Sequence, residues 1–143
     1  MSRGLQVALL ILGALVFVLA LLFSSGTSQV ADQALQYELK AIGQSIYEYH
    51  ETMGQWPHNV GDLARTSLPV RVPYWKPSLE SGSIVVVWHD HLNPNPQDNR
   101  DVVLAYHSRG TLAMFGRQWV CWGDLRVEYV SSKRLHAALA AAP

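Results

Sequence analysis

Three histidines in the second half of the chain have the side chains best suited to metal chemistry. His89 and His91 flank Asp90, and His107 follows the next stretch of strand-forming residues. Alternate residues of a strand face the same side of a sheet, so His89 and His91 share a face if the strand extends through them, with His107 as a third ligand. Histidines beside a polar loop are also typical of a solvated surface. We favour the solvated surface and predict no metal site.

A second group of possible ligands lies in one polar loop after Asn93–Pro96. Asp98, Asn99 and Asp101 supply carboxylate and amide oxygens, which are the ligands that calcium prefers. The spacing of an EF-hand loop is missing. Solvated turn residues are therefore the preferred interpretation, and calcium is the alternative.

The sequence gives little indication of a catalytic site. Ser108 follows His107, but the residues around it do not form a nucleophile elbow. The carboxylates are scattered, and the sequence has no glycine-rich phosphate loop. We therefore predict that the protein is not an enzyme, with no catalytic residues, no cofactor and no small-molecule substrate.

The composition excludes two further classes of protein: nucleic-acid-binding proteins that depend on a basic surplus, and cysteine-rich proteins. The chain of 143 residues has 11 basic and 11 acidic side chains, so no basic surplus exists to bind nucleic acid. A single cysteine, Cys121, excludes an internal disulfide and a cysteine-rich zinc site. It stands between Val120 and Trp122 in a predicted strand, which favours a buried inert thiol over an intermolecular disulfide.

Strands are expected to position most of these side chains. Runs rich in β-branched and aromatic residues predict four strands, over residues 83–88, 102–106, 118–122 and 125–130. The last two form a hairpin around Gly123 and Asp124. Arg126 and Glu128 then point to the opposite face from Leu125, Val127 and Tyr129. A short helix over 133–141 follows, capped by Ser131 or Ser132.

An amphipathic helix precedes the strands. Its apolar residues recur at intervals of three and four: Leu35, Leu39, Ile42, Ile46, Tyr49 and Met53. Gly54 is its expected C-cap, and Asn59 caps a short turn over 60–63. Prolines at 69, 73 and 77 predict extended connecting chain. The expected fold is α+β, with this helix packed on an antiparallel meander sheet; packing on a partner helix is the alternative for the stripe.

An apolar run at the N-terminus predicts a membrane anchor. Residues 5–23 contain Gln6 as their one polar side chain. About 19 residues at ~1.5 Å each span about 28 Å, close to the ~30 Å hydrocarbon core of a bilayer. Inside lipid such a run has to be helical. Side chains expected in the bilayer include Val7, Leu10, Leu12, Val16, Phe17, Leu19, Leu22 and Phe23.

Charge predicts the orientation of this anchor. Arg3 precedes the run and no charge follows it before Asp32, so the N-terminus is expected in the cytoplasm. The chain then consists of an anchor and joint, residues 1–28, and a periplasmic or extracellular domain, residues 29–143. The alternatives are a buried soluble helix or a secretory signal cleaved near Ser24–Gly26, although such signals usually have shorter apolar runs.

Two stretches of the domain, together with the anchor, resemble bacterial type IV pilin-like proteins and type II secretion pseudopilins. The first, LKAIGQSIYEYHETMGQWPHNVGDL over Leu39–Leu63, is similar to a family segment of helix, tyrosine, Gly-x-Tyr/Trp-Pro and short turn. The second is VLAYH, then WVCWGDLRVEYVSSKRL, within Val103–Leu139. It resembles the C-terminal "VLFxDGHVEWVS" pattern of short pilin-like proteins, with Leu125 in place of the glycine.

The resemblance implies a structural subunit of a secretion or filament system in the bacterial cytoplasmic membrane. Its partners would be the lipid bilayer and other pilin-like subunits or secretion components. In the family a leader is cut after a glycine, which corresponds to cleavage between Gly4 and Leu5. Leu9 then takes the place of the family's glutamate, and no acid occurs before Asp32. The alternative is a membrane-tethered binding domain that does not polymerise.

Overall fold

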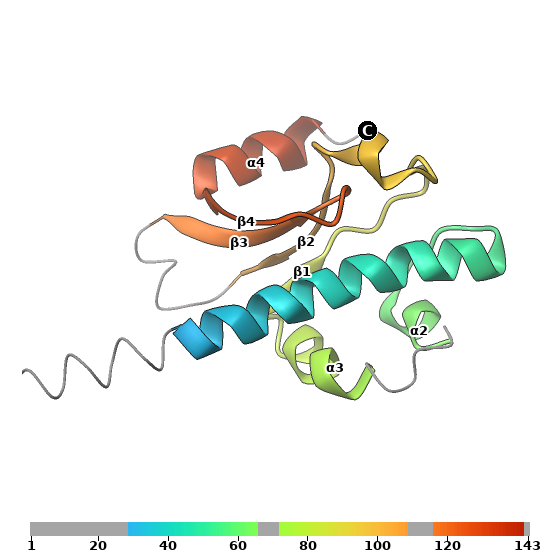
Figure 1. Cartoon of the computed structure of the whole chain (residues 1–143), viewed down its shortest axis with the longest axis horizontal. Helices are drawn as coiled ribbons and strands as arrows, with labels where there is room; N and C mark the ends of the chain where they lie inside the picture. Colours follow the sequence, from blue (N-terminus) through green and yellow to red (C-terminus); the bar gives the residue numbers. More distant parts are fainter. Residues whose placement is uncertain (1–28, 66–71, 109–115, 142–143) are drawn as a thin grey trace, which may run out of the picture. The chain divides into compact units, whose positions relative to one another are not determined.

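A long helix and a four-stranded antiparallel sheet form the core of the fold (Figure 1). The structure, a computed structural model, describes residues 29–65, 72–108 and 116–141. The chain divides into two units, Met1–Ala34 and Leu35–Pro143, and the packing described below is that of the second unit alone. The predicted α+β class is confirmed.

The predicted membrane anchor over residues 5–23 lies outside the described residues, as does the possible cleavage between Gly4 and Leu5. Within the described ranges, none of the helices combines the length and the apolar character that crossing a bilayer requires. The anchor therefore stays a prediction from sequence.

The long helix covers residues 29–53, and most of its predicted apolar stripe is buried. The buried positions lie on one face and are Leu39, Ile42, Ile46 and Tyr49. Met53, at the end of the stripe, is 44% exposed because the last turn lies beyond the packed part of the helix. Gly54 ends the helix with a φ of 71°, which glycine adopts readily, and its N–H donates to the His50 carbonyl at 2.8 Å.

The short turn after this helix also forms where the sequence predicts it. Helix α2 spans Val60–Leu63, and Asn59 is its N-cap. The Asn59 side chain accepts a hydrogen bond from the Asp62 N–H at 3.0 Å, as expected for an N-cap. Leu63 is completely buried, so this turn fixes the chain against the core.

The segment that contains Pro73 and Pro77 is helical, so the prediction of extended chain is wrong there, while Pro69 lies outside the described residues. Helix α3 spans Val72–Glu80 and contains Pro77. Pro73 costs little because it lies in the first turn, where the N–H has no helical partner. Pro77 removes one interior hydrogen bond. Packing of Leu79 against the core helps to offset that loss.

The four predicted strands are present, with their ends displaced by a residue or two. They are β1 (Ile84–Val86), β2 (Val103–His107), β3 (Arg117–Trp122) and β4 (Val127–Ser131). Every pairing is antiparallel, and the order β1-β2-β3-β4 is that of a meander. The strands β1 and β4 therefore lie at the two edges of this sheet.

The sheet lies between two helical layers (Figure 1). Residues 35–53 of the long helix cover one face, and this core includes Leu39, Ile42, Leu104 and Cys121. Helix α4 (Ser132–Ala141) covers the other face, whose core is Val103, Val120, Trp122, Val130 and Leu135. As predicted, α4 is capped: the Ser131 Oγ accepts from the Arg134 N–H at 3.3 Å.

Candidate functional site

The three histidines that suggested a metal do not converge. Strand β1 ends at Val86, so His89 and His91 lie in the following loop rather than on one strand face. His89 is buried, and its Nε2 lies 2.8 Å from the Val103 carbonyl oxygen, at the start of β2. His107 is at the other end of that strand, and His91 is exposed. Across the ranges that the structure describes, no group of three His, Cys, Asp or Glu is placed to hold a metal.

The neighbouring serine and histidine have separate surroundings. The Ser108 hydroxyl donates a hydrogen bond to the Gly82 carbonyl oxygen, and the Ser108 N–H donates to the Ser83 carbonyl at 2.8 Å. Burial lowers the pKa of the His107 imidazole, which favours its neutral form. Ser108 therefore joins the turn before β1 to the end of β2.

The oxygen-rich loop has a structural organisation of its own. It contains the 3₁₀ helix η1 (Pro96–Asn99), and the Asp98 carboxylate accepts a hydrogen bond from Asn95 Nδ2 at 3.1 Å. Asp101 is exposed. Asn99 is only 5% exposed and turns inward, away from both carboxylates. The ligand set considered for calcium is thus divided between solvent and interior.

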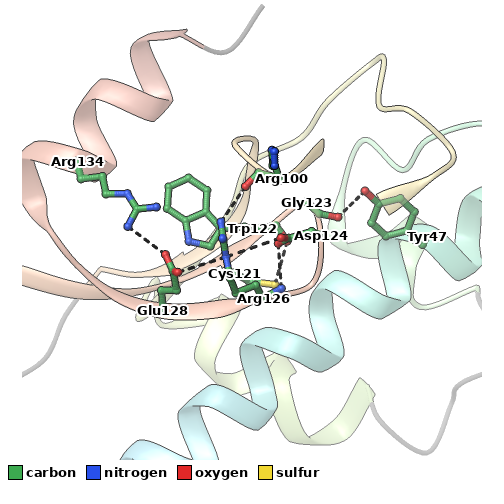
Figure 2. Close-up of polar contacts among 9 residues, drawn as sticks. All are labelled: Tyr47, Arg100, Cys121, Trp122, Gly123, Asp124, Arg126, Glu128 and Arg134. Carbon is green, nitrogen blue, oxygen red and sulfur yellow. Dashed lines mark hydrogen bonds and ion pairs between the residues drawn. The ribbon is translucent and has the colours of Figure 1, made fainter. Parts of the chain in front are cut away.

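Asn99 is part of a buried polar contact that joins three segments of the chain. Its Nδ2 donates to the Tyr47 hydroxyl at 2.7 Å. That hydroxyl in turn donates to the Gly123 carbonyl at 2.7 Å (Figure 2). We call Tyr47, Asn99 and Gly123 the Tyr47 junction. Burial raises the pKa of Tyr47, although its hydrogen bond with Asn99 acts in the opposite direction. The hydroxyl therefore keeps its proton at neutral pH and can donate.

The junction also explains why residue 123 is glycine. A β-carbon there would lie 2.3 Å from the Asn99 carbonyl oxygen, far inside van der Waals contact. The Gly123 N–H donates to the Val102 carbonyl at 2.7 Å, which closes the hairpin turn onto the preceding loop. The junction is therefore built from the long helix, the η1 loop and the β3–β4 turn.

Comparisons with known proteins give no family for this chain. No family model, no curated protein and no solved structure matches it. Its function is therefore argued from the geometry and from the resemblance of two stretches described above.

The arginine cluster, Trp122, Arg126, Glu128 and Arg134, lies on the opposite side of β4 from the long helix (Figure 2). Arg126 Nε and Arg134 Nη1 lie 3.3 and 3.1 Å from the two Glu128 carboxylate oxygens. Both guanidinium groups also lie over the Trp122 ring, at 5.8 and 4.9 Å from its centroid. The predicted shared orientation of Arg126 and Glu128 is confirmed.

Arg126 also contacts the β3–β4 turn and the η1 loop. Its Nε lies 3.8 Å from the Asp124 carboxylate, and its Nη2 donates to the Arg100 carbonyl at 3.1 Å. The side chains of Arg126 and Arg134 are 40% and 52% exposed, so each ion pair contributes little to stability. They chiefly fix where the positive charges lie on this surface.

Cys121 has the environment of an inert thiol, as the sequence predicted. It is completely buried, and burial raises its pKa to about 12, with Asp124 acting in the same direction and Lys40 in the opposite one. The thiolate, which is the reactive form, is therefore scarce at neutral pH.

Part of this geometry was missed at the level of sequence. The sequence suggests Asn99 only as a metal ligand, although an amide carries both donors and acceptors and suits a buried junction equally well. Tyr47 is the tyrosine of the family-like stretch Leu39–Leu63, and the resemblance alone points to it. The glycine of the Trp122-Gly123-Asp124 turn was the one local signal for a close approach of two backbones.

Proposed function

We propose that this chain is a membrane-anchored, pilin-like structural subunit of a secretion or filament system. The two stretches that resemble the family, Leu39–Leu63 and Val103–Leu139, are distant in sequence. The hydrogen bond from Tyr47 to Gly123, at 2.7 Å, joins them directly. This observation carries the proposal, because both family-like stretches take part in the same contact. That contact attaches the long helix to the last hairpin.

The Gly-x-Trp-Pro segment supports the same proposal. Gly54 ends the helix in the left-handed region, so the chain reverses toward Trp56 and Pro57. Trp56 is 7% exposed, and its ring meets the Tyr47 ring edge-on, with centroids 5.5 Å apart and planes at 88°. The tryptophan thereby buries the tyrosine whose hydroxyl reaches the hairpin.

The turn at Leu125 gives further support. In the resembling proteins this position holds glycine, and here Leu125 has a φ of 64°. That is a backbone conformation that glycine adopts at little cost and that leucine rarely adopts. The chain thus keeps the turn geometry that the family pattern implies while departing from its residue.

In this proposal residues 5–23 cross the bacterial cytoplasmic membrane and the domain lies in the periplasm or outside the cell. Its partners are the bilayer and other pilin-like subunits or secretion components. No acidic residue precedes Asp32, so assembly would proceed without a carboxylate in the apolar run. The same observation favours the second candidate, a tethered binding domain that does not polymerise.

Processing of the N-terminus and release by shear test the proposal. We expect the mature chain to begin at Leu5 and to appear in sheared surface fractions. Gly4→Leu should keep the leader and shift the mobility of the chain, whereas the matched change Gly13→Leu inside the apolar run should leave processing intact.

Other outcomes separate the alternatives. An intact Met1, with all protein retained in the membrane after shearing, would contradict a filament and favour the tethered domain. A soluble chain that begins after residue 24 would contradict the anchor itself.

A further inference from the structure

Within the part of the chain that the structure describes, strand β4 presents unpaired backbone groups at the edge of the sheet. Antiparallel ladders alternate between residue pairs that exchange hydrogen bonds and pairs that do not. The Trp122 N–H donates to the Arg126 carbonyl at 2.9 Å, and this contact sets the alternation along β3 and β4. Val127 and Tyr129 therefore point their N–H and C=O groups away from β3, toward the open edge.

Arg117 confirms the direction of one of these groups. Its Nη2 donates to the Tyr129 carbonyl oxygen at 2.8 Å, and its guanidinium lies 4.7 Å from the centroid of the Tyr129 ring. Among the described residues, the N–H and C=O of Val127 and the N–H of Tyr129 have no hydrogen-bond partner. The opposite edge of the sheet offers less backbone to a partner, because β1 has only three residues and lies against α3.

An open hollow follows this edge. One part has a volume of about 660 Å³ and is bounded by β4, Gln36 of the long helix and α4. A second part of about 290 Å³ shares Gln36 and Val127 with the first and extends to Lys40. Together the two parts provide space for an extended chain beside the unpaired backbone groups.

The charge of this hollow is unlike that of the whole chain. The chain has equal numbers of acidic and basic residues, whereas the hollow is lined by Arg117, Lys40, Arg126 and Arg134 and by a single carboxylate, Glu128. If Asp124, which pairs with Arg126, is counted as well, the cations still outnumber the carboxylates by two. A ligand that matches this surface carries negative charge.

We propose that the β4 edge binds an extended acidic peptide segment of another protein, which adds to the sheet as a fifth strand. The backbone of Val127 and Tyr129 would hydrogen-bond the peptide. Alternate side chains of the peptide point to opposite faces of the sheet. Arg117 lies on the face that the long helix covers. Arg134 belongs to α4, which covers the other face. Arg117 exchanges its bond to Tyr129 for a peptide carboxylate. This inference does not depend on the pilin-like proposal.

A synthetic peptide tests this binding. The probe is a fluorescein-labelled heptapeptide of alternating Val and Glu, added to the full-length chain in a nonionic detergent and followed by anisotropy. We expect saturable binding that weakens between about 0.01 M and about 0.15 M salt, as the Debye length falls from about 30 to about 8 Å. A peptide of alternating Val and Lys should not bind, and equal binding of the two peptides would overturn the proposal.

Charge reversals locate the site. Arg117→Glu and Lys40→Glu should each weaken binding about tenfold, which corresponds to ~1.4 kcal/mol. Lys133→Glu is the matched control, because Lys133 is exposed on α4 and lines neither part of the hollow. An equal loss in the control would show that only net charge matters and would overturn the site.

Amide hydrogen exchange separates strand addition from loose association. In the free chain the amides of Glu128 and Val130 should exchange slowly, because they belong to the β3 ladder, while those of Val127 and Tyr129 exchange fast. The peptide should slow exchange at Val127 and Tyr129. Binding without that change would overturn the proposal. So would slow exchange at these amides without peptide in a chain that elutes as a dimer, since a second copy would then occupy the edge.

Discussion

Gly43 of the long helix lies so close to Cys121 of β3 that a β-carbon at residue 43 would be 2.9 Å from the Cys121 Sγ. The same β-carbon would lie 3.1 Å from Leu125 Cδ2. Both distances are shorter than ordinary van der Waals contacts. The helix therefore approaches the sheet so closely at Gly43 that a larger residue would displace these side chains, and this approach buries the thiol.

Replacing Gly43 with alanine should destabilise the fold. Overpacking of a closed core costs about 1–3 kcal/mol, and alanine returns up to ~1 kcal/mol through its greater helix propensity. We expect a net loss of about 1 kcal/mol in the free energy of unfolding, measured by urea denaturation of the chain in detergent.

Cys121→Ala provides the matched test of that contact. It removes the Sγ that the new methyl group would meet, so the double variant Gly43→Ala/Cys121→Ala should lose less than the sum of the two single variants. If the two losses simply add, the contact between residues 43 and 121 is not what requires glycine.

Much of this architecture was predictable because it depends on local patterns. The three-and-four spacing from Leu39 to Tyr49 indicates a buried helix face, and the β-branched runs indicate strands. The caps at Gly54 and Asn59 follow from side-chain and backbone chemistry within a few residues. Each of these features was expected from sequence and is present.

The features that were missed depend on contacts between distant residues. Helix α3 forms despite Pro77, and nothing near that proline in the sequence signals the core contact of Leu79. His89 is a candidate ligand only if the strand continues past Val86, where β1 ends. The role of Asn99 depends on Tyr47, 52 residues away, and no local pattern carries that information.

Leu125 should show a reversed preference between alanine and glycine. Its φ of 64° places it in the left-handed region, which costs a residue with a β-carbon ~1–2 kcal/mol. Leu125→Ala and Leu125→Gly both remove the leucine side chain, but only the glycine variant relieves the backbone. We expect Leu125→Gly to be about 1 kcal/mol more stable than Leu125→Ala in urea unfolding.

Val127 supplies the control for this comparison. It lies in β4, where glycine is unfavourable, so Val127→Ala should be more stable than Val127→Gly. The same order at both positions would argue against the left-handed conformation at residue 125.

The Tyr47 junction predicts that a small change at Asn99 has a large effect. The Asn99 Nδ2 donates to the Tyr47 hydroxyl and to the Asn93 carbonyl, each at 2.7 Å. Asn99→Asp keeps the shape but replaces this donor with an acceptor, so buried oxygen atoms face each other. We expect a loss of about 1–3 kcal/mol in unfolding free energy at neutral pH, with part of it recovered in acid, where the carboxyl can donate.

Asn93→Asp is the comparison for that variant, because Asn93 is exposed on the same loop and its side-chain oxygen accepts from the Asn95 N–H, which an aspartate still does. It should change stability far less. Tyr47→Phe should also destabilise the chain, since it leaves the Gly123 carbonyl and the Asn99 amide without the hydroxyl between them. If Asn99→Asp and Asn93→Asp behave alike, the junction does not stabilise the fold.

Glu38 should make stability depend on pH in the direction opposite to a salt-bridged carboxylate. Burial raises its pKa above the ordinary value of 4.5, and a hydrogen bond from the Ser78 hydroxyl, 3.2 Å from Oε1, acts in the opposite direction. The folded state therefore binds the proton more tightly than the unfolded state. This contribution to stability is fully present below pH 4.5 and is lost as the pH rises through the raised pKa.

Glu38→Gln removes this titration while keeping an oxygen that Ser78 can donate to. The variant and the wild type should have similar unfolding free energies below pH 4.5, and the variant should be the more stable at neutral pH, where the wild type holds a partly buried carboxylate. Urea unfolding across this pH range measures the difference. Glu51→Gln, at an exposed position on the same helix, corrects for the change in net charge. A constant difference between Glu38→Gln and wild type at every pH would show that burial of Glu38 does not affect its protonation.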